Sequence, residues 1–161
     1  MKLLTSLTAL LSATAISASA AYATTDIEKI EVEIDLTAIE DVEAAEVWND
    51  IANDLETAIA KLLVDQITEE GATILIDIDE VFLANSLSQM LGVAETQLKG
   101  DVVIKEDDSA KHESFELTVT AVQAQAYYPE GTDVTVLNVG NEAFYNAMID
   151  SFAEHVADKV K

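Results

Sequence analysis

The chain has 161 residues, half of them hydrophobic, with 31 acids against eight bases, all of them lysine, and a formal net charge of −23. Proteins bind nucleic acid and anionic lipid mainly through clusters of lysine and arginine, so this balance excludes both as expected partners. With no cysteine, the chain can form neither a disulfide nor a thiolate metal site. The hydrophobic share is large enough for a core and argues against a disordered acidic chain.

The first 23 residues have the composition of a secretory signal peptide. A lysine precedes an apolar stretch, and small residues then form two A-x-A cleavage sites, Ala18–Ala20 and Ala21–Ala23. The apolar stretch is too short and too rich in serine and threonine for a transmembrane helix, which needs about 20 residues. We therefore expect residues 1–23 to be removed and residues 24–161 to form one soluble domain, periplasmic or secreted, without a membrane span.

The first element of that domain is a strand over residues 27–37. Its centre reads "IEVEIDL", in which apolar residues alternate with acids such as Glu31 and Glu33. This period of two predicts a strand with one buried face and one face that carries carboxylates.

A long amphipathic helix is predicted within residues 38–71. Asp41 is a plausible N-cap, and Gly71 is the expected end, which gives roughly 27 residues. The apolar residues recur at steps of three and four: Trp48, Ile51, Leu55, Ala58, Ile59 and Leu62.

Three further strands are predicted over residues 73–81, 98–106 and 113–128, with a polar hairpin turn between the last two. Asn141 can cap a last helix with an apolar stripe formed by Tyr145, Met148, Phe152, Val156 and Val160. The order β-α-β-β-β-α indicates an α+β fold. We expect a two-layer sandwich in which an antiparallel-rich sheet of about four strands carries both helices on one face.

The other sheet face would then be exposed and acidic. It would carry Glu31, Glu33, Asp35, Asp77, Asp79, Asp101 and Glu116. One interpretation is solubility in a salty medium, where screening reduces the repulsion between like charges. The other is a divalent-cation site, for which Asp77, Asp79, Glu31 and Glu33 are weak candidates. Acids two apart on one strand stand nearly 7 Å from each other, too far to chelate one ion alone, so we predict no dedicated metal site and no cofactor.

No catalytic motif accompanies these acids. The sequence contains no HExxH, no G-x-S-x-G, no S-x-x-K and no phosphate-binding glycine loop. His112 fits an exposed turn and His155 a helix edge. A glycosidase-like carboxylate pair could hide among so many acids, but nothing marks one. We predict that the protein is not an enzyme.

A long apolar insertion, residues 81–97, joins two of the strands and contains Leu87, Met90 and Leu91. These residues either close one end of the core or form an exposed patch that binds a partner. Tyr127 and Tyr128 are further candidates for the contact surface, because amphipathic aromatic residues are enriched in interfaces. We expect binding at the insertion rather than at the acidic face, which has no arginine and no aromatic cluster.

The segments "LANSLSQMLG", "GDVVI" and "YYPEG…NEAFYNAMIDSFAEHVADKV" resemble small acidic exported proteins of uncharacterised function in marine bacteria. More loosely, the layout is similar to the α+β domains of cell-envelope accessory lipoproteins, although the lipobox cysteine is absent. The resemblance implies no known activity.

Together these patterns favour a non-enzymatic binding or envelope accessory module with an envelope protein as partner. An acid-rich divalent-cation-binding protein is the alternative, and a hydrolase with unmarked carboxylates is the third hypothesis. Partner identity and oligomeric state stay open.

Export can be tested directly. The A-x-A site that precedes Thr24 predicts a mature N-terminus at Thr24, with Ala21 as second choice. Mass spectrometry of the periplasmic or secreted fraction should find one of these, and an intact Met1 on a cytoplasmic protein would contradict the signal peptide.

Overall fold

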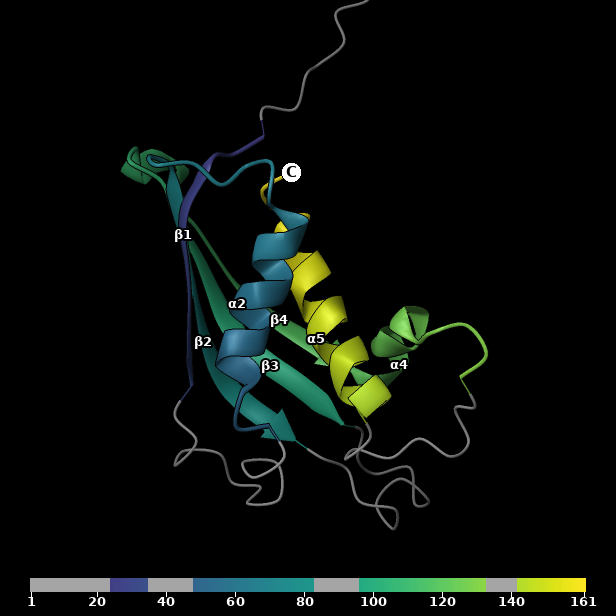
Figure 1. Ribbon diagram of the computed structural model, residues 1–161. Coiled ribbons are helices and arrows are strands. Elements are labelled where there is room, and N and C mark those ends of the chain that lie inside the picture. Colours follow the sequence, from purple (N-terminus) through teal and green to yellow (C-terminus); the bar gives the residue numbers. More distant parts are fainter. Residues whose placement is uncertain (1–23, 35–47, 83–95, 133–141) are drawn as a thin grey trace, which may run out of the picture.

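The computed structural model describes residues 24–34, 48–82, 96–132 and 142–161, which build a four-stranded sheet packed against helices (Figure 1). The strands lie in the sheet in the order in which they follow in the chain: β1 (Ile27–Ile34), β2 (Ala72–Phe82), β3 (Gln97–Lys105) and β4 (Glu113–Thr120).

The sheet is mixed. β2 pairs antiparallel with β3, and β3 pairs antiparallel with β4, but β1 runs parallel to β2. The predicted antiparallel-rich sheet is therefore only partly matched. Alternation along a strand indicates which face is buried, but it does not fix the direction of the neighbouring strand.

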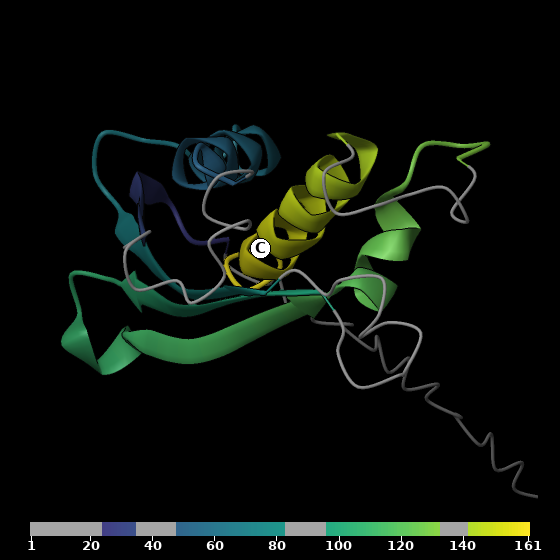
Figure 2. The same cartoon turned by 90° about the horizontal axis from the view of Figure 1, so that it is seen from below.

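Three helices lie within the described residues: α2 (Ile51–Leu62), α4 (Ala121–Ala124) and α5 (Glu142–Ala157). Two single 3₁₀ turns, η1 (Ser109–Lys111) and η2 (Gln125–Tyr127), accompany them. Figure 2 shows α2 and α5 on the same side of the sheet. α2 packs against β1 and α5, whereas α5 also contacts β3 and β4. The α+β class agrees with the sequence. The prediction of two helices on one face is only partly matched, because the described residues contain a third helix, α4. In the parts of the chain that the structure describes, no helix is long and apolar enough to span a bilayer.

The core lies between the helices and the inner face of the sheet. The apolar stripes predicted for both helices enter it, although Leu62 at the end of α2 is 39% exposed. The largest fully buried side chains are Trp48, Phe152, Ile27, Ile51, Leu55, Ile59, Leu63, Ile74, Ile76, Leu98, Met148 and Val81. Burial of each such side chain contributes about 1.5–3 kcal/mol, so this interface supplies most of the folding energy.

One polar contact joins the two large helices. The Tyr145 hydroxyl donates to Oδ2 of Asp54 at 2.6 Å, and its ring meets Trp48 edge-on with 5.3 Å between centroids. Burial, followed by the hydrogen bond to the Asp54 carboxylate, raises the pKa of Tyr145 far above its usual value. The phenol therefore stays protonated and keeps its hydrogen bond from α5 to α2.

The predicted end of α2 at Gly71 is wrong, because the helix ends at Leu62. The chain then turns back to β1, where the Ile27 N–H donates to the Gln66 carbonyl at 2.8 Å and the Thr68 N–H donates to the Ile27 carbonyl at 2.9 Å. These bonds require backbone groups that a longer helix would have used internally. The predicted N-cap, Asp41, lies outside the described residues.

The predicted fourth strand is also too long. β4 ends at Thr120, whose side chain accepts from the Gln123 N–H at 3.4 Å while the Gln123 side chain accepts from the Thr120 N–H at 2.9 Å. This reciprocal capping box starts α4. The T-x-x-Q pattern was readable in the sequence, but the apolar alternation that precedes it concealed the switch to helix.

Gly100 offers a test of the sheet packing. A Cβ at this position would lie 2.7 Å from the Asp77 carbonyl oxygen and 3.1 Å from the Ile78 side chain. Gly100→Ala should therefore lower the free energy of unfolding by about 1–3 kcal/mol, the usual cost of overpacking. Ser114→Ala, at an exposed site on β4, is the control and should change it by no more than about 0.5 kcal/mol in a urea melt. Equal urea midpoints for Gly100→Ala and Ser114→Ala would show that β2 and β3 do not approach so closely at Gly100.

Candidate binding surface

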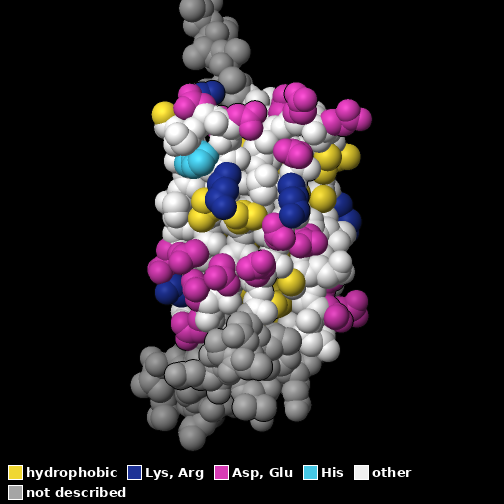
Figure 3. Space-filling model, turned by 90° about the vertical axis from the view of Figure 1, so that its left-hand side faces the viewer, with side chains coloured by type: hydrophobic (Ala, Val, Ile, Leu, Met, Phe, Trp, Pro, Cys, Tyr) yellow, Lys and Arg dark blue, Asp and Glu magenta, His cyan; other side chains and the backbone are white. Residues whose placement is uncertain are grey.

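Four carboxylates form a continuous row across the outer face of the sheet, the face opposite α2 and α5. The strand register places Glu33 beside Asp77, Asp77 beside Asp101, and Asp101 beside Glu116, so each strand contributes one member. We call these four residues the acidic row. Figure 3 shows acidic side chains as a belt across this face. The sequence predicted the face on which these acids lie, but not that the register would align them.

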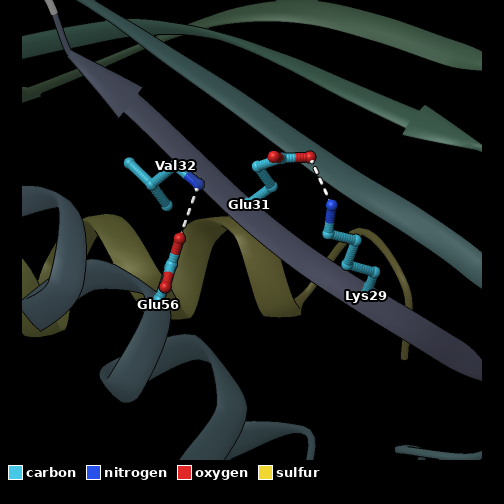
Figure 4. A network of polar contacts seen from close by, with 4 residues as sticks. All are labelled: Lys29, Glu31, Val32 and Glu56. Carbon is cyan, nitrogen blue, oxygen red and sulfur yellow. Dashed lines mark hydrogen bonds and ion pairs between the residues drawn. The ribbon is translucent and has the colours of Figure 1, made fainter.

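Lysine side chains form ion pairs with Glu116, at one end of the acidic row, and with Glu31, which lies on β1 outside the row. Lys99 Nζ lies 2.8 Å from Oε2 of Glu116, and Lys29 Nζ lies 2.9 Å from Oε2 of Glu31 (Figure 4). The hydrogen bond and the charge of each carboxylate raise the pKa of its lysine partner. Both pairs are solvated and add little stability, so the row keeps a strong negative potential.

Asp79 lies at an irregularity of β2, where the register shifts between Ile78 and Glu80. Partial desolvation, followed by the charges of Asp101 and Asp77, raises the pKa of its carboxyl group. The folded protein therefore holds this proton more tightly than the unfolded chain does. Stability associated with Asp79 is greatest at low pH and falls as the pH rises through its titration.

A shallow apolar hollow adjoins the acidic row. It has a volume of about 320 Å³ and is lined by Glu31, Glu33, Leu75, Ile76, Asp77, Asp101 and Val103. Leu75 and Val103 pair across β2 and β3 at outward positions. Figure 3 shows apolar side chains beside the acidic belt. In the sequence, the interruption of polar alternation at these two residues is the signal for this hollow.

The acidic row places carboxylates of neighbouring strands side by side, which bears on whether they could bind a cation. Neighbours across a sheet lie about 4.5–5.5 Å apart at Cα, closer than acids two apart on one strand. Of the weak candidate ligands, Glu33 and Asp77 are neighbours, whereas Glu31 is paired with Leu75 and Asp79 lies at the irregularity. Among the described residues, no group of three or more His, Cys, Asp or Glu is arranged to hold a metal ion.

Both histidines contact backbone carbonyl groups. His112 Nε2 lies 2.6 Å from the Glu106 oxygen, and His155 Nδ1 lies 2.6 Å from the Ser151 oxygen. These contacts suit the turn and helix-edge roles that the sequence indicated.

The predicted partner-binding residues fall into two groups. Leu87, Met90 and Leu91 lie outside the described residues. Tyr127 and Tyr128 are half-buried and pack against the core. Burial raises the pKa of both hydroxyl groups, and the Glu154 carboxylate raises that of Tyr127 further. Part of each ring therefore serves the fold, and its role in binding stays a prediction.

Comparison with known proteins yields only distant structural neighbours. No family model matches the chain, and no curated protein matches it. Among solved structures, a Xanthomonas campestris protein of the family DUF330 is 9% identical, with a TM-score of 0.46, and the match covers 88% of this chain and 86% of that one. A minor lipoprotein from Acinetobacter baumannii is 15% identical, with a TM-score of 0.35 and coverage of 83% and 91%. A protein described as uncharacterised is 9% identical, with a TM-score of 0.45 and coverage of 84% and 91%. The sequence suggested a loose similarity to lipoprotein domains, and a lipoprotein is among these neighbours, but similarity at this level assigns no function.

The acidic row predicts a salt response. Sodium chloride should raise the melting temperature, because like charges opposite each other on neighbouring strands are destabilising and salt screens them. Asp77→Asn with Asp101→Asn should raise the melting temperature at low salt and flatten its dependence on salt. Scanning calorimetry from 0.01 to 1 M NaCl measures both effects, and an unchanged salt slope in the double variant would mean that the repulsion lies elsewhere.

Proposed function

We propose that the protein is a non-enzymatic binding module, periplasmic or secreted, that serves the cell envelope by binding a protein partner through the outer face of its sheet. The observation that carries the proposal is the acidic row beside an apolar hollow, on a face that α2 and α5 leave uncovered. Interfaces typically combine an apolar centre with a polar rim.

The charge of this surface indicates the chemistry of the partner. Four aligned carboxylates with one ion pair, Lys99–Glu116, repel anions and attract a basic surface. The resulting field speeds encounter with a cationic partner at low salt. The Leu75–Val103 pair supplies apolar contact that does not depend on salt.

The sequence favoured the insertion at residues 81–97 over the acidic face as the binding site. We propose the insertion as a second contact, with Leu87, Met90 and Leu91 as its apolar anchor. Long loops inside compact domains are more often functional than idle. Tyr127 and Tyr128 could extend that contact through the exposed parts of their rings.

Weak divalent-cation binding is the second candidate function. The pairs Glu33–Asp77 and Asp77–Asp101 favour it, because their carboxylates are cross-strand neighbours. Ca²⁺ needs six to eight oxygen ligands, and one pair supplies at most four, so affinity should be low.

A charge-matched pull-down from the native envelope tests the leading proposal. Asp77→Asn with Asp101→Asn should lose most of the partner that the wild-type protein retains, because it removes half of the acidic row. The control, Asp65→Asn with Glu69→Gln, makes the same change in net charge at exposed sites in the turn after α2 and should retain the partner.

Equal loss in both double variants would show that net charge alone attracts the partner and would contradict a specific outer-face site. A stabilisation of several degrees by millimolar Ca²⁺, absent with Mg²⁺ at the same ionic strength, would favour the cation-binding candidate instead.

A further inference from the structure

We infer that the outer edge of β1 is a docking site for an extended, basic segment of the partner, which adds to the sheet as a fifth strand. This inference rests on the proposed function, because it names the way in which such a partner attaches. Addition of a strand to an open sheet edge is a common mode of peptide recognition, in which backbone hydrogen bonds supply affinity and alternate side chains supply specificity.

β1 ends the sheet on one side. At its beginning the outer edge is closed, because Ile27 exchanges backbone hydrogen bonds with Gln66 and Thr68. Farther along, the Val32 N–H points away from β2. Backbone groups alternate between the two edges of a strand, so those of Ile30 and Ile34 share the edge of Val32. Among the described residues, no backbone group pairs with these two.

The Val32 N–H on this edge is bonded to a side chain. Oε1 of Glu56, on α2, accepts the Val32 N–H at 3.0 Å (Figure 4). A carbonyl group of an incoming strand could replace this carboxylate oxygen after a change of Glu56 rotamer, without movement of the backbone. Glu56 therefore protects the edge while the partner is absent, and it gives way when a strand arrives.

A groove between β1 and α2 can receive an apolar side chain of that strand. It has a volume of about 310 Å³ and is lined by Ile27, Glu28, Lys29, Ile30, Glu56, Thr57, Ala60 and Ile67. Ile67 is 46% exposed and offers such a side chain an apolar contact at the groove.

The charge of β1 selects the occupant. Side chains of an added strand alternate between the two faces, and those on the outer face would stand beside Glu31 and Glu33, where the acidic row ends. Lysine or arginine there would extend the row with opposite charge, and opposite charges on adjacent strands stabilise the pairing. A second copy of this chain would instead bring four such acids together, Glu31 and Glu33 of each copy, against two lysines, Lys29 of each copy. The geometry and charge thus favour a strand that alternates basic and apolar residues.

A synthetic nine-residue peptide of alternating lysine and valine is the first probe. The control peptide carries N-methyl groups on every second residue, which keep its charge but remove the donors that face β1. The unmodified peptide should bind the wild-type protein at least about tenfold more tightly, which corresponds to one or two hydrogen bonds. Amide NMR signals of Ile30, Val32 and Ile34 should shift most.

The second test compares Glu56→Ala with Glu28→Ala. Each variant removes one carboxylate beside the edge, but only the first frees the Val32 N–H. Glu56→Ala should therefore bind the peptide several-fold more tightly than Glu28→Ala does. If the carboxylates merely attract the lysines, both variants will lose affinity equally, and the inference is wrong.

Failure of the β1 edge site and failure of the proposed function give different results. Equal binding of both peptides, with NMR shifts at Asp77 and Asp101, would overturn the edge site while the proposed function stands. No peptide binding, together with a wild-type protein that retains no envelope partner in the pull-down, would overturn both. Dimerisation of Glu56→Ala through β1 in sedimentation experiments would overturn the choice of a basic segment over a second copy.

Discussion

The parallel pairing of β1 with β2 is the constraint on which most of the architecture depends. Two consecutive strands run parallel only when the chain between them crosses back along the sheet, and α2 lies on that connection. α2 thereby covers the apolar side of β1, and α5 packs beside it over the same face (Figure 2). The carboxylate side of every strand is left on the outer face, and β1 is left at the edge of the sheet.

This arrangement gathers like charges, and the protein tolerates them without neutralising them. Lys99 reaches Glu116 at one end of the acidic row, but its inner members, Asp77 and Asp101, face each other across β2 and β3. Repulsion of this kind costs some tenths of a kcal/mol per pair, which the buried core, with Trp48 and Phe152 fully enclosed, readily offsets. A surface kept acidic at some expense of stability is consistent with selection for solubility or for a cationic partner.

The sequence predicted the strands and helices where periodicity alone decides them. Alternation in "IEVEIDL" correctly identified β1 and its acidic side, and steps of three and four identified the buried faces of α2 and α5. The sequence failed to predict element ends that tertiary contacts or caps determine. α2 ends early because Gln66 and Thr68 pair with Ile27, and β4 ends at a capping box. For the site, a period of two predicts a face but carries no information on strand partners. The acidic row and the Glu56 contact are products of register and could not be read from one sequence.

The same alternation that makes β1 soluble on one face makes its edge hazardous. A strand with apolar residues at every second position and free backbone groups is a template for uncontrolled pairing, and natural proteins protect such edges with charge or with a covering element. Here both devices meet in Glu56, whose carboxylate adds negative charge and also accepts the Val32 N–H. A permanent cover would need no such reversible contact, since a longer turn after α2 could extend the pairing of Ile27 with Gln66 and Thr68 along the whole edge. A single side chain that can rotate away protects the edge against identical acidic chains and leaves it accessible to a strand of opposite charge.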